Sequence, residues 1–284
     1  MSTVFTLPAT LPILVTSSPV VPSYPDTYTA LIAGEYIAIQ QGTVNIQNAI
    51  GTRGTGSVTV KSDLGTVWER VKSSGSRAMV VASSSPVVFS AGADIKAFTK
   101  MDESSGAELI EDGHALLREF GTEGIATIAA VNSLAFGGGC ELAMACDVRI
   151  AAESAVFGQP EVKLGIIPGF GGTQRLPRLV GPQKALEMNL IGDAITGGEA
   201  YEVGLVNHIA PDHEMFDTAL AFARKLAGQA PIAVAQIKKV SHQADIDDGI
   251  EAEKGGFQTV FFSEDAKEGI GAFLGKRRPD FKGR

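Results

Sequence analysis

Apolar and polar positions follow two different periods along the middle of the chain. Short, nearly unbroken apolar runs, typical of strands buried on both faces, occupy Ala78–Ala82 and Ile125–Val131, and Asp147–Ala152 adds a third. Apolar residues spaced along one helical face predict helices over Ser62–Ser73 and Ser104–Phe120. Because strands and helices alternate, the pattern predicts α/β layers.

The last part of the chain has the pattern of helices alone. Thr196 and Glu199 have the spacing of a capping box, in which a hydroxyl and a carboxylate satisfy free backbone N–H groups. Asp212 precedes one helical stretch, and two further helices are predicted over Glu251–Phe262 and Asp265–Leu274. We therefore expect a helical region over residues 196–284, following an α/β core over residues 26–195.

Residues 1–25 carry no charged side chain, and five prolines interrupt them: Pro8, Pro12, Pro19, Pro22 and Pro25. Because proline breaks an apolar helix and no basic segment is present, we expect an extended or poorly ordered lead-in rather than a signal peptide. The most apolar stretch, Ile125–Val148, contains Glu141 and a glycine triplet, so we expect a buried strand, turn and helix there and no membrane span.

Composition excludes several classes of function. A formal net charge of -8 over 284 residues disfavours nucleic acid or an anionic membrane as the main partner. The two cysteines, Cys140 and Cys146, are expected to be buried thiols, which excludes a disulfide scaffold or a four-thiolate metal site and fits a cytoplasmic protein. The four histidines lack zinc-hydrolase spacing. Gly51–Ser57 lacks the lysine of a nucleotide-binding loop and is interpreted as a turn.

Three glycine-containing segments let the backbone approach a ligand closely. In Phe89–Lys96, small residues follow an apolar strand, and the N–H of Ala93 faces outward if the chain turns there. In Phe136–Leu142 a strand ends and a helix begins near Gly138, and the free N–H groups of a helix N-terminus suit a developing oxyanion. In Phe157–Arg175 a carboxylate precedes a second glycine-rich turn into a helix.

Two carboxylates, Glu141 and Glu161, lie beside this glycine-rich backbone in otherwise apolar sequence. An isolated buried carboxylate is costly, and a close pair does not readily ionise twice, so one of the two tends to be protonated. An acid and a base side by side are what the addition or removal of water requires. From the residues alone, a helix-capping Glu141 and a solvated Glu161 remain an alternative.

Together with the tail Glu268–Lys282, these segments resemble the crotonase (enoyl-CoA hydratase/isomerase) superfamily from about Ala78 to the end, most specifically over Gly137–Arg175. The resemblance implies an α/β fold, a crotonase-like spiral of ββα units with a C-terminal helical trimerisation region, assembled as a trimer or a dimer of trimers. It also implies hydration of a trans-2-enoyl-CoA to a 3-hydroxyacyl-CoA. No metal or redox cofactor is implied, since coenzyme A is part of the acyl-CoA thioester substrate.

The resemblance further implies a role for each matching residue. The N–H groups of Ala93 and Gly138 would form the oxyanion hole for the thioester carbonyl. Glu141 would be the base or water anchor and Glu161 the acid that protonates C2, although the pair could exchange or share these roles. The backbone of Gly169 would line the same site. The expected contacts with CoA are Ala91, Asp94, Ile95 and Lys96 beside the adenine, and Phe273 and Lys276 closing over the CoA.

The N-terminal fifth departs from the family pattern. It keeps Asn48-Ala49, but the first basic residue of the chain is Arg53. Charge for the CoA phosphates would therefore have to come from Arg53, Lys96 or Lys276.

Three other functions remain open at this stage. A double-bond isomerase needs only one proton shuttle, for which Glu161 would serve, but the presence of Glu141 favours the hydratase. An RNA-binding relative would depend on the basic cluster Lys276-Arg277-Arg278, which the net charge of -8 disfavours. A catalytically inactive structural subunit is the third, and the glutamate pair does not support it.

Overall fold

The computed structural model describes residues 13–16, 38–40, 43–46, 64–83, 87–243 and 245–284. Gly51–Ser57, Asn48-Ala49 and Arg53 lie outside the described residues, as does most of the N-terminal lead-in. Within that lead-in, Ile13–Thr16 form a strand, β1.

A large sheet forms the centre of the described residues, with seven strands in the order β11-β8-β6-β4-β1-β3-β2. Its strands are β1, β2 (Ala38–Gln40), β3 (Thr43–Ile46), β4 (Ala78–Ala82), β6 (Ala126–Val131), β8 (Val148–Ala152) and β11 (His208–Ala210). Strands β4, β6, β8 and β11 run parallel, whereas β1 pairs antiparallel with β4 and with β3. The apolar runs predicted as buried strands are β4, β6 and β8, and this prediction is confirmed.

A smaller sheet has the strand order β10-β9-β7-β5 among the described residues. Its strands are β5 (Val88–Ser90), β7 (Leu134–Phe136), β9 (Val156–Gly158) and β10 (Ile195–Thr196). The first three run parallel, and β10 is antiparallel to β9. Neighbouring strands β5, β7 and β9 therefore end at the same edge of this sheet.

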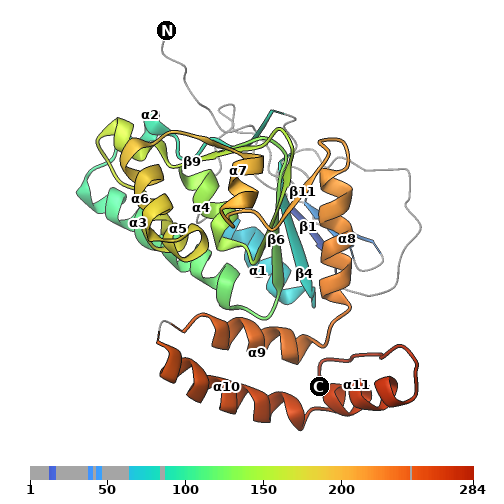
Figure 1. Ribbon diagram of the computed structural model, residues 1–284. Helices are drawn as coiled ribbons and strands as arrows, with labels where there is room; N and C mark the ends of the chain where they lie inside the picture. Colours follow the sequence, from blue (N-terminus) through green and yellow to red (C-terminus); the bar gives the residue numbers. More distant parts are fainter. Residues whose placement is uncertain (1–12, 17–37, 41–42, 47–63, 84–86, 244) are drawn as a thin grey trace.

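The chain repeats one path through both sheets: a strand of the large sheet, a strand of the small sheet, then a helix. The helices that follow each pair are α2 (Ile95–Phe98) and α3 (Glu103–Thr122) after β4–β5, α4 (Gly138–Ala145) after β6–β7, and η2 (Pro160–Leu164) and α5 (Gly172–Val180) after β8–β9. This order confirms the expected spiral of ββα units. Helix α8 (Met215–Ala227) packs against the large sheet at β4, β6 and β8 (Figure 1).

The remaining helices of the body are α1 (Gly65–Ser73), α6 (Pro182–Ile191) and α7 (Gly197–Glu202). Thr196 caps α7 as predicted, accepting a hydrogen bond from the N–H of Glu199 at 3.1 Å. The second half of the predicted capping box is wrong, because the Glu199 carboxylate instead pairs with Lys184 at 2.9 Å.

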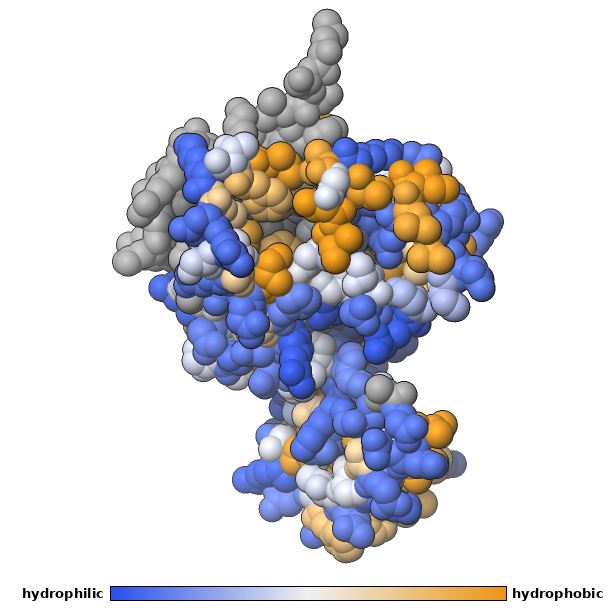
Figure 2. Space-filling view, turned by 90° about the vertical axis from the view of Figure 1, so that its left-hand side faces the viewer, coloured by the Kyte–Doolittle hydropathy of each residue, from blue (hydrophilic) through white to orange (hydrophobic). Residues whose placement is uncertain are grey.

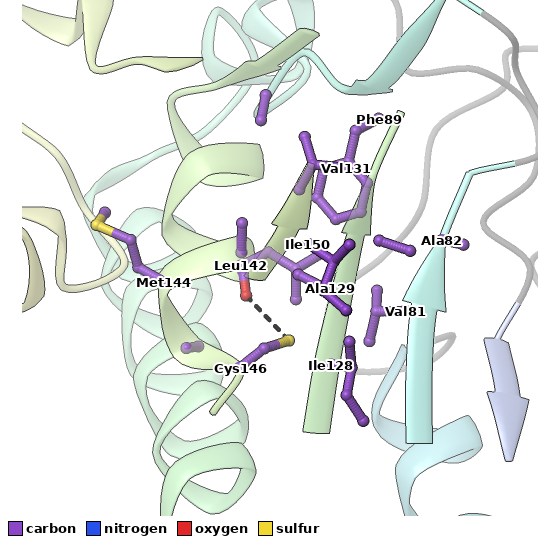
Figure 3. Close-up of a cluster of buried hydrophobic side chains, with 14 of the residues drawn as sticks. Val81, Ala82, Phe89, Ile128, Ala129, Val131, Leu142, Met144, Cys146 and Ile150 are labelled. Carbon is purple, nitrogen blue, oxygen red and sulfur yellow. Dashed lines mark hydrogen bonds between the residues drawn. The ribbon is translucent and has the colours of Figure 1, made fainter. Parts of the chain in front are cut away.

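A close-packed apolar core holds α4 against the large sheet. Figure 3 shows Leu142 of α4 facing Val131 of β6 and Ile150 of β8, with the Cys146 thiol donating to the Leu142 carbonyl at 3.5 Å. Both cysteines are buried free thiols, as expected, and burial raises the pKa of each to about 12. This packing fixes the helix that carries Glu141.

The last three helices form an arm that lies below the body in Figure 1. They are α9 (Pro231–Ser241), α10 (Ile246–Phe261) and α11 (Glu264–Leu274). Helix α10 starts earlier than the predicted Glu251, because Asp245 caps it by accepting from the N–H groups of Asp247 and Asp248. None of the described helices is both long and apolar enough to cross a membrane.

One buried cation joins this arm to the body. Lys238 of α9 lies 2.7 Å from the Asp147 carboxylate and donates to the carbonyls of Phe120 and Ile125 at 2.9 and 2.5 Å. Phe120 lies in the last turn of α3, whereas Ile125 and Asp147 directly precede the strands β6 and β8. The Lys238 ammonium group therefore connects α9 to the end of α3 and to the starts of two strands of the large sheet.

The final residues fold back along α11. The buried carboxylate of Asp265 accepts from the N–H groups of Lys282 and Gly283 at 2.6 and 2.8 Å, and its own N–H donates to the Arg284 carbonyl at 3.1 Å. The Arg77 guanidinium, at the start of β4, donates to the Phe281 carbonyl at 2.9 Å. The tail therefore contacts both the arm and the body.

Candidate active site

Three segments that carry the predicted site residues meet at one edge of the small sheet. The segments follow β5, β7 and β9, which are neighbouring parallel strands, so their carboxyl ends lie side by side. The first contains Ala93, the second Gly138 and the third Glu161. The topology therefore brings together residues that are far apart in the sequence.

Gly92 allows the first two segments to approach closely. Its φ is +91°, and a Cβ at this position would lie 2.8 Å from the Phe136 carbonyl oxygen and 3.2 Å from the Gly138 nitrogen. Gly138 is the first residue of α4, so its N–H has no partner within the helix. Ala93 and Gly138 both line one cavity, with the N–H of Gly138 at the positive end of the α4 dipole.

Glu141 lies in the first turn of α4 with 1% of its surface exposed. Its Oε1 accepts from the backbone N–H groups of Phe170 at 2.8 Å and Gly172 at 2.6 Å. Burial raises the pKa of this carboxyl, while the two N–H groups and the nearby Arg175 guanidinium oppose the rise. The side chain is therefore held rigidly with one oxygen fully engaged.

Glu161 lies in η2 with 8% of its surface exposed. Burial is the main cause that raises its pKa to about 7, and the negative charge of Glu141 adds to the rise. With the Gln159 amide oriented so that its nitrogen faces the carboxyl, Gln159 donates to both Glu161 oxygens at 3.1 and 3.2 Å. Because its pKa is close to 7, this carboxyl can both give and take a proton near neutral pH.

The two glutamates line a cavity of about 1110 Å³ enclosed by α2, α3, η2 and the loop before α5. Of the residues expected to contact substrate, Ala91, Asp94, Ile95 and Gly169 line this cavity as well. Hydrophobic residues gather over the upper part of the face in Figure 2, which is the side of the molecule formed by α2, α3 and α6. The cavity is thus an apolar space with a carboxyl pair and helix-terminal N–H groups at its wall.

Two expected substrate contacts, Phe273 and Lys276, are not among the lining residues of this cavity. A third, Lys96, lies in α2, which borders the cavity, but its side chain lies outside what the structure describes. Phe273 is the last residue but one of α11, three residues before Lys276, and 82% of the Phe273 surface is exposed. Both belong to the arm, on the other side of the body from α2 (Figure 1). Within one chain, therefore, the C-terminal pair does not reach the cavity.

Sequence reasoning missed four residues that hold the glutamates: Gln159, Phe170, Gly172 and Arg175. Gln159 is fully buried two residues before Glu161, and a polar residue so close to a candidate acid is a signal that was available. Phe170 and Gly172 act through backbone N–H groups, which any residue but proline provides, so their types gave no signal.

Among the residues that the structure describes, no group of three or more His, Cys, Asp or Glu side chains could hold a metal ion. Separately, the two carboxyl groups and the backbone N–H groups at the cavity wall are suited to proton transfer and to binding an oxyanion.

Comparison with known proteins decides the family. The enoyl-CoA hydratase/isomerase family profile matches residues 54–284. A probable enoyl-CoA hydratase of Bacillus subtilis is 47% identical over 200 residues, which cover 69% of this chain and 78% of that protein. The chain belongs to the enoyl-CoA hydratase/isomerase family. A crotonyl-CoA hydratase of Syntrophomonas wolfei is 42% identical over 206 residues, covering 72% of this chain and 79% of that one.

Solved structures of the enoyl-CoA hydratase/isomerase family share the fold. The crystal structure of an enoyl-CoA hydratase from Bacillus anthracis matches with a TM-score of 0.74 and 38% identity, covering 78% of this chain and 87% of that chain. The expected crotonase-like fold is confirmed. The part of this chain that matches the family profile includes every segment around the cavity and the whole C-terminal arm.

Proposed function

We propose that this protein hydrates a trans-2-enoyl-CoA to the 3-hydroxyacyl-CoA. The observation that carries the proposal is the pair Glu141 and Glu161, two buried carboxyls on the wall of one apolar cavity that Gly138 also lines. The names of its relatives, among them a crotonyl-CoA hydratase, support the same reaction.

In the proposed mechanism, the N–H groups of Ala93 and Gly138 bind the thioester carbonyl oxygen. Water attacks C3 while Glu141 accepts a proton from it, and negative charge develops on that carbonyl oxygen as the enolate forms. Glu161 then donates its proton to C2, which completes the addition of water. Proton exchange between the two carboxyls restores the starting state.

The environments of the two carboxyls support this division of roles. Burial raises the pKa of Glu141, but two N–H groups and Arg175 oppose the rise and favour the charged form that a base requires. The pKa of Glu161 is raised to about 7, so a large fraction carries the proton that an acid must give. The two roles can nevertheless be shared, because the carboxyls influence each other's charge.

A substrate panel tests this function. The enoyl thioester absorbance is followed: its loss is measured with 2-enoyl-CoAs of short to long acyl chains, and its appearance is measured with a 3-enoyl-CoA. Hydration of the 2-enoyl series supports the proposal. Conversion of the 3-enoyl-CoA alone makes the protein an isomerase with Glu161 as shuttle, and turnover of none of them refutes both.

We further propose that the reaction uses no cofactor beyond the CoA of its substrate. The chemistry assigned above needs only proton transfers and backbone N–H donors, which Glu141, Glu161, Ala93 and Gly138 supply. Dialysis against a chelator should leave kcat unchanged.

We also propose assembly as a trimer or a dimer of trimers, in which a second copy supplies Phe273 and Lys276 to the CoA. Phe273 and Lys276 lie on the arm and do not line the cavity of their own chain, which supports a contribution from a second copy. The assembly is further supported by the large apolar side chains that the arm exposes, namely Ile246, Phe257, Phe262, Phe273 and Leu274. Light scattering of the purified protein tests the assembly, and a monomer at micromolar concentration would refute it.

The two unpaired buried thiols support a reducing compartment, and we propose the cytoplasm. An RNA-binding role receives less support, because Arg277 of the basic cluster is engaged by both oxygens of Glu268, at 2.5 and 2.7 Å. A salt titration of RNA affinity tests it.

A further inference from the structure

Gly113 occupies the interior of α3, where glycine is an unfavourable helix residue. It is buried, and a Cβ added to it would overlap Cδ1 and Cε1 of the Phe170 ring. The ring therefore occupies the space that any side chain at position 113 would need. Elsewhere in the same helix, an added Cβ at Gly121 would meet only the side-chain end of the exposed His242.

The opposite edge of the Phe170 ring faces a second glycine. A Cβ on Gly138 would lie 3.2 and 3.4 Å from Cδ2 and Cε2 of the ring. The ring thus spans the gap between α3 and the start of α4, with a glycine on each side. Because neither residue carries a Cβ, the ring fits between the two helix backbones, where a side chain at either position would crowd it.

The backbone of Phe170 is tied to the carboxyl pair. Its N–H donates to Glu141 at 2.8 Å, and its carbonyl accepts from the Arg175 guanidinium at 2.8 Å. One residue therefore places its ring beside Gly138, a proposed oxyanion donor, and binds Glu141, the proposed base, through its backbone N–H.

We propose that Phe170 is a positioning residue that sets the spacing between the Gly138 N–H and the Glu141 carboxylate, and that Gly113 is the matching gap that fixes the ring. The inference rests on the proposed hydratase function. Since a shift of about 1 Å in a catalytic group can cost about 100-fold in rate, a fixed ring at this point is a determinant of kcat.

The first test is Gly113→Ala. The new methyl group displaces the ring and with it the N–H that holds Glu141, so kcat should fall at least about tenfold while KM for the enoyl-CoA changes by less than about twofold. Affinity for a saturated acyl-CoA, measured by calorimetry, should be unchanged. Gly121→Ala adds the same methyl group to the same helix away from the cavity, and should keep the kcat of the wild type.

The second test combines this change with Phe170→Ala. Removing the ring should lower kcat by itself. In that background the methyl group of Gly113→Ala fills vacated space, so the double variant should equal or exceed the kcat of Phe170→Ala alone. Circular dichroism and Tm are measured for every variant. If Gly113→Ala alone does not fold, the comparison of Phe170→Ala with the double variant decides the test.

Equal losses from Gly113→Ala in both backgrounds would overturn the proposal, as would full kcat in Gly113→Ala. A Gly113→Ala variant whose Tm falls, but whose folded enzyme keeps the kcat of the wild type, would also overturn the proposal. The contact between Gly113 and the Phe170 ring would then contribute to stability only. A wild type that hydrates no 2-enoyl-CoA contradicts the proposed function instead, so the two failures are distinct.

Discussion

The Oε1 atom of Glu141 accepts a hydrogen bond from the N–H of Gly172 at 2.6 Å, and Gly172 is the first residue of α5. The positive end of a helix dipole therefore faces a carboxylate that is almost fully buried. Burial instead raises the pKa of Glu161, in η2, to about 7, and the negative charge of Glu141 adds to the rise. This asymmetry separates the two carboxyls chemically, although both are acids of the same kind.

Replacing each glutamate by glutamine separates their roles. Glu161→Gln removes the transferable proton, so hydration should fall about 10²–10⁴-fold. Glu141→Gln removes the base and should reduce hydration by a similar factor, but it should spare any conversion of a 3-enoyl-CoA, which needs only one shuttle. Both substrates are assayed with each variant, and near-normal hydration by Glu161→Gln would remove Glu161 from the mechanism.

The raised pKa of Glu161 predicts how activity depends on pH. The acid must be protonated to donate to C2, and its pKa is about 7. The kcat/KM value of the free enzyme should therefore fall as pH rises through about 7. A pH–rate profile that stays flat to pH values well above this range would contradict the role of Glu161 as acid.

The same shift predicts a stability effect. Between its ordinary value of 4.5 and its raised pKa of about 7, Glu161 is protonated in the folded chain and ionised in the unfolded one. Its contribution to the free energy of unfolding is thus present at low pH and is lost as pH rises through about 7, a difference of about 3 kcal/mol at most. Urea denaturation should show that Glu161→Gln gains stability relative to wild type at about pH 8 but not at about pH 5. Glu253→Gln, on the exposed face of α10, is the control and should show no such difference.

Gly138→Pro deletes the N–H at the start of α4. Loss of one oxyanion donor typically costs about 3–4 kcal/mol of transition-state stabilisation, so kcat should fall by roughly 10²–10³-fold. Proline is tolerated in the first turn of a helix, and circular dichroism checks that the fold persists. A folded variant with full activity would mean that another N–H group binds the thioester oxygen.

Lys238→Met tests the joint between arm and body. The change leaves the Asp147 carboxylate without its buried partner and frees two carbonyls, so the free energy of unfolding should fall by about 3–5 kcal/mol. Lys239→Met alters the next residue of α9, which is exposed, and should be nearly neutral. Chemical denaturation of both variants gives the comparison, and equal stability of the two would exclude Lys238 as an anchor.

Lys276→Ala tests the proposed contact with the phosphorylated end of CoA. Loss of a charged hydrogen bond worth about 1.5–3 kcal/mol should raise KM for a CoA thioester roughly tenfold or more, with kcat little changed. A pantetheine thioester lacks these phosphates and should be indifferent to the substitution. An unchanged KM for the CoA thioester would show that the tail does not close over the substrate.

The sequence was sufficient for those features that depend on local pattern. The predicted strand Ala78–Ala82 has the same bounds as β4, and the glycine triplet before Glu141 marks the start of α4. A buried strand and a helix start are specified by consecutive residues, so a single sequence reveals them.

Features that depend on contacts distant in sequence could not be predicted. Nothing in the residues around Gly113 indicates that an aromatic ring from position 170 lies against it, because the contact joins two separate turns of the spiral. The pairing of Ile13–Thr16 between β3 and β4 is equally non-local. The placement of Phe273 and Lys276 on a projecting arm depends on packing of the whole C-terminal region.

The fold-back of the tail onto Asp265 has a consequence for exopeptidases and for engineered C-termini. Both oxygens of this buried carboxylate are satisfied by the N–H groups of Lys282 and Gly283. Loss of Lys282 and Gly283 would remove both donors and leave the Asp265 carboxylate without these two hydrogen bonds. A chain without these residues would lose stability in the arm far out of proportion to the mass removed.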